Sequence, residues 1–165
     1  MQKFIIALTI VISIVLESAF FPFISLAGVV PNLTMILVIC LALRQDNDKG
    51  ALIGLAAGLT KDIVIGRIIG VSGITFMLIG YFIGKYNHKI FPDHLTTPLI
   101  ITMFGTLFHE SIYLLFVFFM GYQTDLFLAF SQIWVVQAIY NFLLVFPVFT
   151  GVSQLYHWHV MKKQY

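Results

Sequence analysis

The sequence predicts an all-α integral membrane protein, a compact bundle of six transmembrane helices in one domain over residues 1–165. Three observations lead to this fold class: the composition, the spacing of the apolar runs and the distribution of positive charge. Of the 165 residues, 60% are hydrophobic and only 10% are charged, whereas soluble domains are about 45–50% apolar and about 25% charged. A soluble domain of this size could not bury so much apolar surface.

Six apolar runs set the expected helices, because a bilayer core of about 30 Å requires about 20 apolar residues per helix. We predict helices over about 4–22, 26–43, 49–66, 69–84, 97–120 and 126–156. The first run begins like a signal peptide but lacks a small-residue cleavage site, so we expect a retained helix. The second is the weakest prediction, since the apolar run after Pro31 is short. The third and fourth runs are so close together that they predict an antiparallel hairpin.

The basic residues predict the orientation. With the N-terminus in the cytoplasm, seven of them fall on the inner side: Lys3, Arg44, Lys49, Lys85, Lys89, Lys162 and Lys163. Only Lys61 and Arg67 fall on the outer side. Cytoplasmic loops of membrane proteins carry such an excess of Lys and Arg. Omitting the second helix would move the C-terminal lysines outside, so the charge pattern favours an even number of spans with both termini in the cytoplasm.

Glycines recur at four-residue spacing in the third predicted helix. Gly50, Gly54 and Gly58 are followed at the same interval by Asp62. Small residues let helices approach closely in a membrane, where hydrophobic burial contributes little to helix association. Each step of four drifts by about 40° around the helix, so these residues form a broad strip. Two interpretations are open: packing inside the bundle, or contact with a transmembrane helix of another protein.

Charged side chains inside the predicted spans form a second pattern. Three carboxylates each lie about 13 residues into a helix that rises from the cytoplasmic side, about 20 Å above its start: Glu17, Asp62 and Glu110. We expect an acidic layer in the outer half of the bundle, with three candidates for neutralising it: Lys61, Arg67 and His109. Such a layer suits paired charges that fix helix packing, a site for a partner's polar or basic group, or a pocket for a small molecule or ion.

Motifs of catalysis are incomplete. His109-Glu110 begins like the zinc motif H-E-x-x-H, but Tyr113 replaces the second histidine. The sequence has no G-x-S-x-G motif, no phosphate-binding glycine loop in an aqueous segment and no basic patch for nucleic acid. We therefore expect no enzyme, no metal and no cofactor. Other polar residues within the spans are expected to hydrogen-bond between helices rather than act as nucleophiles: Ser18, Thr106, Ser111, Gln137 and Asn141.

Residues 31–84 resemble the signature region of the rod shape-determining protein MreD family. The resemblance rests on a proline that opens an apolar run, a short polar turn, a G-x-x-x-G-x-x-x-G-L-x-x-D helix and a glycine-led next span with a G-Y pair. The matching positions are Pro31, Gly50, Gly54, Gly58, Leu59, Asp62, Gly70, Gly73, Gly80 and Tyr81. This specific match covers about a third of the chain, whereas the length and the number of spans agree over all of it.

The resemblance implies a non-catalytic, multi-pass subunit of the bacterial cytoplasmic (inner) membrane, involved in cell shape and lateral peptidoglycan synthesis. The implied partner is the single-span protein MreC, with MreB, RodZ, RodA and a class B penicillin-binding transpeptidase in the wider complex. The family's fold is similar to the substrate-binding subunit of energy-coupling factor transporters. A vitamin-transport subunit is therefore the alternative function, although the first helix lacks the A-x-x-x-A strip of many such subunits.

Overall fold

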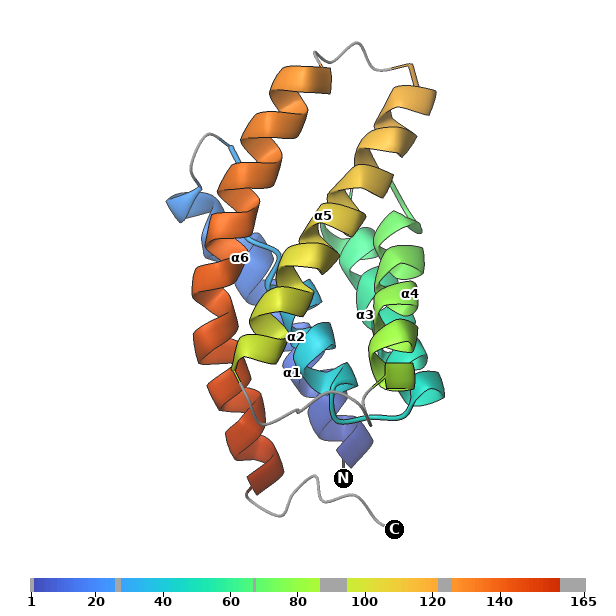
Figure 1. Cartoon of the computed structure of the whole chain (residues 1–165), viewed down its shortest axis with the longest axis vertical. Helices are drawn as coiled ribbons and strands as arrows, with labels where there is room; N and C mark the ends of the chain where they lie inside the picture. The colour runs from blue at the N-terminus through green and yellow to red at the C-terminus, as the bar shows by residue number, and fades with distance from the viewer. Residues whose placement is uncertain (1, 26–27, 67, 87–94, 122–125, 158–165) are drawn as a thin grey trace.

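The computed structural model describes residues 2–25, 28–66, 68–86, 95–121 and 126–157, with the backbone alone described for residues 2, 126–134 and 157. Within these ranges the protein is all-helical. Its elements are α1 (Gln2–Ala19), the 3-10 helix η1 (Phe21–Ile24), α2 (Leu33–Ala42), α3 (Asn47–Val64), α4 (Val71–Tyr86), α5 (Thr96–Phe119) and α6 (Leu126–His157). α1 begins and α6 ends at the same end of the bundle, which we call the base (Figure 1). Consecutive α-helices alternate in direction, away from the base and back.

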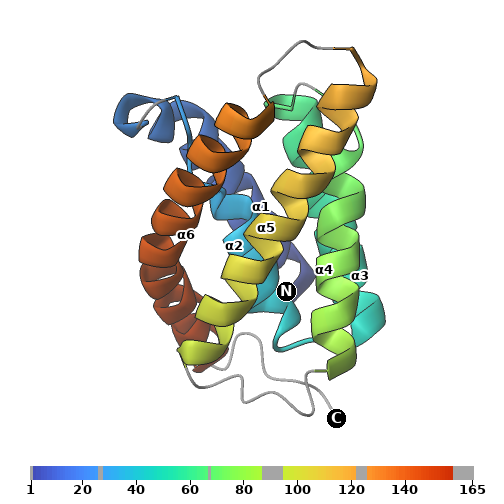
Figure 2. The same cartoon turned by 45° about the horizontal axis from the view of Figure 1, so that its top comes forward.

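The α3–α4 hairpin and α6 lie on opposite sides of the bundle, and α5 crosses between them (Figure 2). α2 lies in the centre and contacts every other α-helix. All ten of its residues are buried, and most of the apolar core comes from α2 and the side chains packed around it. The bundle is therefore assembled around a short central helix.

This central helix differs most from the sequence prediction. A helix over 26–43 was expected, but α2 covers only Leu33–Ala42 and is about 15 Å long, half the thickness of a bilayer core. The chain before it contains η1 and Gly28, whose φ of 77° does not continue a helix. The prediction was wrong because it counted apolar residues and ignored Asn32, whose side chain accepts a hydrogen bond from the Met35 amide and caps α2.

The α3–α4 hairpin is confirmed and is the closest helix pair in the bundle. Gly50 faces Gly80, Gly54 faces Phe76 and Gly58 faces Ser72, so each step along α3 matches a reverse step along α4. A Cβ atom on any of these three glycines would lie less than 3.0 Å from a backbone carbonyl oxygen of α4. The three glycines, which we call the glycine strip, thus pack inside the bundle and let the two backbones touch.

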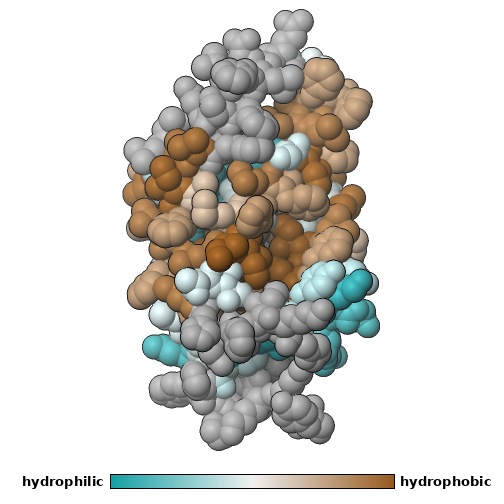
Figure 3. Space-filling view, in the orientation of Figure 1, coloured by the Kyte–Doolittle hydropathy of each residue, from teal (hydrophilic) through white to brown (hydrophobic). Residues whose placement is uncertain are grey.

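The outer surface is strongly apolar. Brown, hydrophobic side chains cover the middle of the molecule, and teal, hydrophilic ones gather toward the base (Figure 3). Large apolar side chains such as Phe4, Ile63, Phe104 and Leu143 point outward and are 62–72% exposed. By length and composition, two described stretches could cross a membrane, Thr96–Phe119 and Val135–Tyr156, and α2 and α4 are shorter apolar helices. An apolar perimeter around buried polar groups is the arrangement expected of a bundle in lipid.

Candidate functional site

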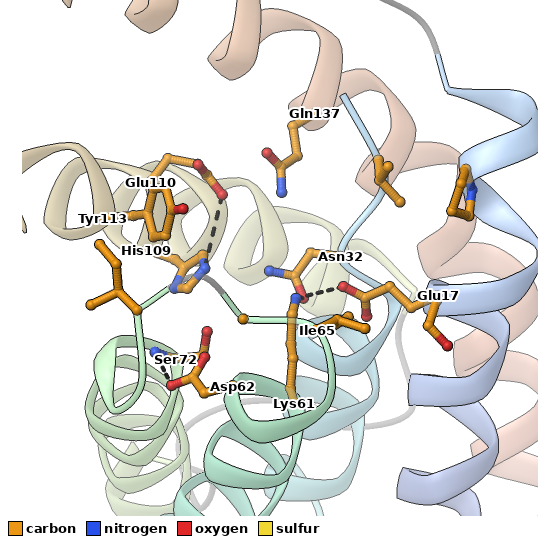
Figure 4. Close-up of a pocket in the computed structure, with 15 residues that line it drawn as sticks. Glu17, Asn32, Lys61, Asp62, Ile65, Ser72, His109, Glu110, Tyr113 and Gln137 are labelled. Carbon is orange, nitrogen blue, oxygen red and sulfur yellow. Dashed lines mark hydrogen bonds and ion pairs between the residues drawn. The ribbon is translucent and has the colours of Figure 1, made fainter. Parts of the chain in front are cut away.

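A polar cavity of about 340 Å³ lies among α1, α3, α4, α5 and α6. Five of the six residues predicted to form a polar layer line it: Glu17, Lys61, Asp62, His109 and Glu110. The sixth, Arg67, lies outside the described residues. Figure 4 shows these side chains converging from helices that are far apart in the sequence. Glu17, Asp62 and Glu110 meet because they lie at similar depths on α1, α3 and α5, which run in the same direction.

Glu17 caps the start of α2. Its Oε2 accepts hydrogen bonds from the Thr34 amide at 3.1 Å and from the Thr34 hydroxyl at 2.8 Å. Its Oε1 lies 2.5 Å from the Lys61 ammonium, which also donates to Asn32 Oδ1 at 2.7 Å. The first amides of a helix have no partner within the helix, and no bulk water reaches a start buried in a bundle. Glu17 and Asn32 therefore supply the acceptors that make this short central helix possible.

The charges at this helix start compensate one another. The partial positive charge of a helix N-terminus favours a carboxylate at the position of Glu17. The side chain of Glu17 is 5% exposed and that of Lys61 is 12% exposed, so solvent screens their attraction little. Removing either partner would leave a buried charge, and the pair is consequently a structural unit.

Asp62 performs the same task for α4. Its Oδ2 accepts hydrogen bonds from the amides of Gly70 at 2.8 Å, Ser72 at 3.0 Å and Gly73 at 3.2 Å. Gly70 has a φ of 103°, which glycine adopts without strain. The chain thus turns back sharply enough for the last turn of α3 to cap the first turn of α4. Asp62 continues the spacing of the glycine strip because the same close hairpin requires both.

His109 and Glu110 lie on α5. His109 Nδ1 is 2.8 Å from the Thr75 hydroxyl oxygen, and its ring packs on Phe76 with centroids 5.2 Å apart. His109 Nε2 lies 3.9 Å from Glu110 Oε1, and Gln137 of α6 lies close enough to interact with the Glu110 side chain. Glu110 thus lies beside the His109 imidazole, and Gln137 lines the same cavity (Figure 4).

The order hydroxyl, imidazole, carboxylate in Thr75, His109 and Glu110 is that of a nucleophilic triad. Thr75 is fully buried and does not line the cavity, however, and its hydroxyl donates to the Val71 carbonyl oxygen at 2.8 Å. A substrate in the cavity could not reach that oxygen. Across the described ranges, no group of three His, Cys, Asp or Glu side chains could hold a metal ion. Among the described residues, these side chains cap helix starts and line a polar cavity, and the Thr75 hydroxyl lies outside that cavity.

The sequence analysis missed Asn32 and Thr34. Asn32 directly precedes the apolar run and follows Pro31, which is the pattern of a helix N-cap and could have located the start of α2. Asn141 on α6 accepts from the Asn32 amide at 2.9 Å and donates to Thr106 on α5 at 2.8 Å. The hydrogen bond expected between helices is thus confirmed for Thr106 and Asn141, and it ties α5 and α6 to the start of α2. For Ser18 and Ser111 the expectation was wrong, because their hydroxyls donate to carbonyl oxygens of their own helices, those of Val15 at 3.1 Å and Leu107 at 2.6 Å.

Comparison with known families gives one match. The family model of the rod shape-determining protein MreD matches residues 1–156. No curated protein and no solved structure matches the chain. The match covers all the glycines, caps and cavity residues described above. MreD proteins are shape-determining membrane proteins that are not known as enzymes. The chain therefore belongs to the MreD family, whose members are membrane proteins of the rod complex that determines cell shape.

Proposed function

We propose that this chain is a non-catalytic, six-span subunit of the bacterial inner membrane, and that it holds MreC within the complex that synthesises lateral peptidoglycan. MreB, RodZ, RodA and a class B penicillin-binding transpeptidase complete that complex in this proposal. Membership of the MreD family supports it. The non-catalytic part of the proposal is also supported by the roles of Glu17 and Asp62, because these two buried carboxylates cap helices. The family match gives no support to the vitamin-transporter alternative.

Six spans are compatible with the short α2. In this proposal the second span consists of α2 together with the non-helical chain that leads into it. Irregular backbone is tolerated at membrane depth where it is buried in protein and its polar groups have partners. Asn141, Glu17 and Asn32 supply such partners at the start of α2. The alternating helix directions then place both ends of the helical bundle at the base (Figure 1).

A groove between α1 and α6 is the observation that carries the partner contact. It has a volume of about 340 Å³ and is lined by Thr9, Ile12, Ser13, Leu16, Leu33, Leu37, Pro147, Val148, Gly151, Val152 and Leu155. Two of these residues, Leu33 and Leu37, belong to α2, so the groove reaches the central helix. A Cβ atom on Gly151 would find no atom within 4 Å. Small residues beside an apolar cleft suit the close approach of another transmembrane helix.

The glycine strip cannot offer the same contact, since α4 already occupies it. We therefore assign the MreC contact to the α1–α6 groove. A partner helix seated there would contact the side chains of Leu33 and Leu37 from α2. It would also lie against Gly151, where backbone can approach backbone.

Substitution of Gly151 by leucine tests this assignment. The added side chain enters open space, so the fold is expected to persist while the groove is blocked. We expect recovery of MreC by co-purification to fall roughly tenfold or more, the change that about 1.4 kcal/mol of lost binding produces. Ala56→Leu is the matched control, because Ala56 is exposed on α3, away from the groove. Equal recovery of MreC with both variants, at equal expression, would rule out the groove as the contact.

A further inference from the structure

The polar cavity contains one carboxylate that no helix start uses. Glu17 is bound to Lys61 and Thr34, and Asp62 is bound to the amides of Gly70, Ser72 and Gly73 at the start of α4. Glu110 is only 6% exposed and lines the same cavity. Its contacts are the Gln137 side chain and, at 3.9 Å, His109 Nε2. No ion pair joins Glu110 to a lysine or arginine within the described ranges.

Lys61 is not the counter-ion of Glu110. It lies near enough to attract Glu110 electrostatically, but its ammonium already contacts Glu17 at 2.5 Å and Asn32 at 2.7 Å. The described wall of the cavity therefore has three carboxylates and one lysine. A buried carboxylate without a cation is costly, and a cationic ligand removes that cost. A free anion would instead meet an excess of negative charge.

The surroundings of Glu110 favour an organic cation over a metal ion. Gln137 offers an amide to the same cavity, and Tyr113, which lies beside Glu110, offers an aromatic ring (Figure 4). Aromatic faces attract alkylammonium groups, and amide oxygens accept their hydrogen bonds. The described side chains form no cluster that could hold a metal ion. A volume of about 340 Å³ lies at the lower end of the range of small-molecule pockets.

We infer that this cavity binds a compact ammonium group, with Glu110 as its counter-ion and with Gln137 and Tyr113 beside it. The group belongs either to a small soluble amine or to a phospholipid headgroup such as that of phosphatidylethanolamine. Both sources present the same primary ammonium chemistry to Glu110. This site would give the protein a ligand of its own, independent of the groove between α1 and α6.

The test uses the purified full chain without MreC, so its outcome does not depend on the proposed partner. Thermal unfolding in detergent is followed with rising ethanolamine, and sodium acetate at equal ionic strength is the control. In parallel, the chain is placed in nanodiscs of phosphatidylethanolamine or phosphatidylglycerol and retained lipid is identified by native mass spectrometry. We expect saturable stabilisation by ethanolamine, retention of phosphatidylethanolamine, or both. The first result indicates a soluble amine and the second a lipid headgroup.

Three variants test whether stabilisation by ethanolamine and retention of phosphatidylethanolamine arise from binding at Glu110. Glu110→Gln keeps the size of the side chain and is expected to weaken the effect about tenfold or more, since a buried charge pair is lost. Asp48→Asn removes an exposed carboxylate from the first turn of α3 and should leave the effect unchanged. Ile65→Phe reduces the cavity without touching Glu110 and should also abolish binding, which keeps the test valid if Glu110→Gln fails to fold. Binding that persists in both cavity variants, preference for phosphatidylglycerol, or no saturable effect of either amine would overturn the inference.

Discussion

Replacing Gly54 by alanine adds one methyl group at the closest approach of α3 and α4. The new Cβ would lie well under 3.0 Å from the carbonyl oxygen of Phe76 and 3.0 Å from the Met77 amide nitrogen. Both are backbone atoms, so no side chain can rotate away to make room. The two helices must separate by about 1 Å before the methyl group reaches ordinary van der Waals distance.

The magnitude follows from the contacts that such a separation weakens. A close helix pair with about 40 atom contacts gains roughly 4–8 kcal/mol at about 0.1–0.2 kcal/mol each, and a gap of about 1 Å forfeits up to half of this. Alanine recovers about 1 kcal/mol through its higher helix propensity. We therefore expect Gly54→Ala to destabilise the fold by about 1–3 kcal/mol, the usual range for overpacking.

Gly151→Ala is the matched control for this prediction. The same methyl group there meets no atom within 4 Å, so only the gain in helix propensity of up to about 1 kcal/mol remains. The two variants should shift the free energy of unfolding in opposite directions, measured by denaturant titration of the protein in mixed micelles. If Gly54→Ala proved as stable as the unmodified chain, the inferred backbone contact between α3 and α4 would be incorrect.

Two further predictions concern the helix caps. Asp62→Ala should lower the free energy of unfolding by about 2–4 kcal/mol, because it removes an N-cap and leaves amides at the start of α4 without an acceptor. Asp62→Asn keeps one acceptor oxygen and should therefore cost less in the same unfolding assay. Lys61→Met should cost about 3–5 kcal/mol by leaving Glu17 as a buried unpaired charge, and adding Glu17→Gln should restore part of that loss in a double-mutant cycle. An additive cycle, or an Asp62→Asn variant as unstable as Asp62→Ala, would contradict these roles.

The α3–α4 hairpin shows what the sequence could predict. Four-residue glycine spacing and a very short connection are local features, and they led directly to a close antiparallel pair. The depth of Glu17, Asp62 and Glu110 was also predictable, since it requires only helix starts and a constant rise per residue. All three now line one cavity. The depth of each of these side chains in the bundle therefore follows from the local sequence of its own helix.

The role of each carboxylate was not predictable in the same way. Glu17 caps α2 only because α2 begins at Leu33, inside the bundle, and because α1 places Glu17 beside that start. Asp62 caps α4 because the hairpin turn folds back over the end of α3. Neither contact follows from spacing along one helix. A sequence pattern treats the three carboxylates alike, whereas the tertiary contacts make two of them helix caps and leave Glu110 facing the cavity.

Composition and local spacing are enough to predict that this chain is helical, strongly apolar and rich in small residues on α3, and its residue pattern resembles the MreD family. They suffice because composition reflects the solvent and local spacing reflects the helix period. Contacts between helices were needed to show that α2 is a short, fully buried central helix, that the glycine strip packs on α4, and that a groove lies between α1 and α6. These features depend on which helix faces pack together. The packing free energy that selects those faces is the sum of contacts between residues far apart in the chain, so a local sequence pattern does not reveal it.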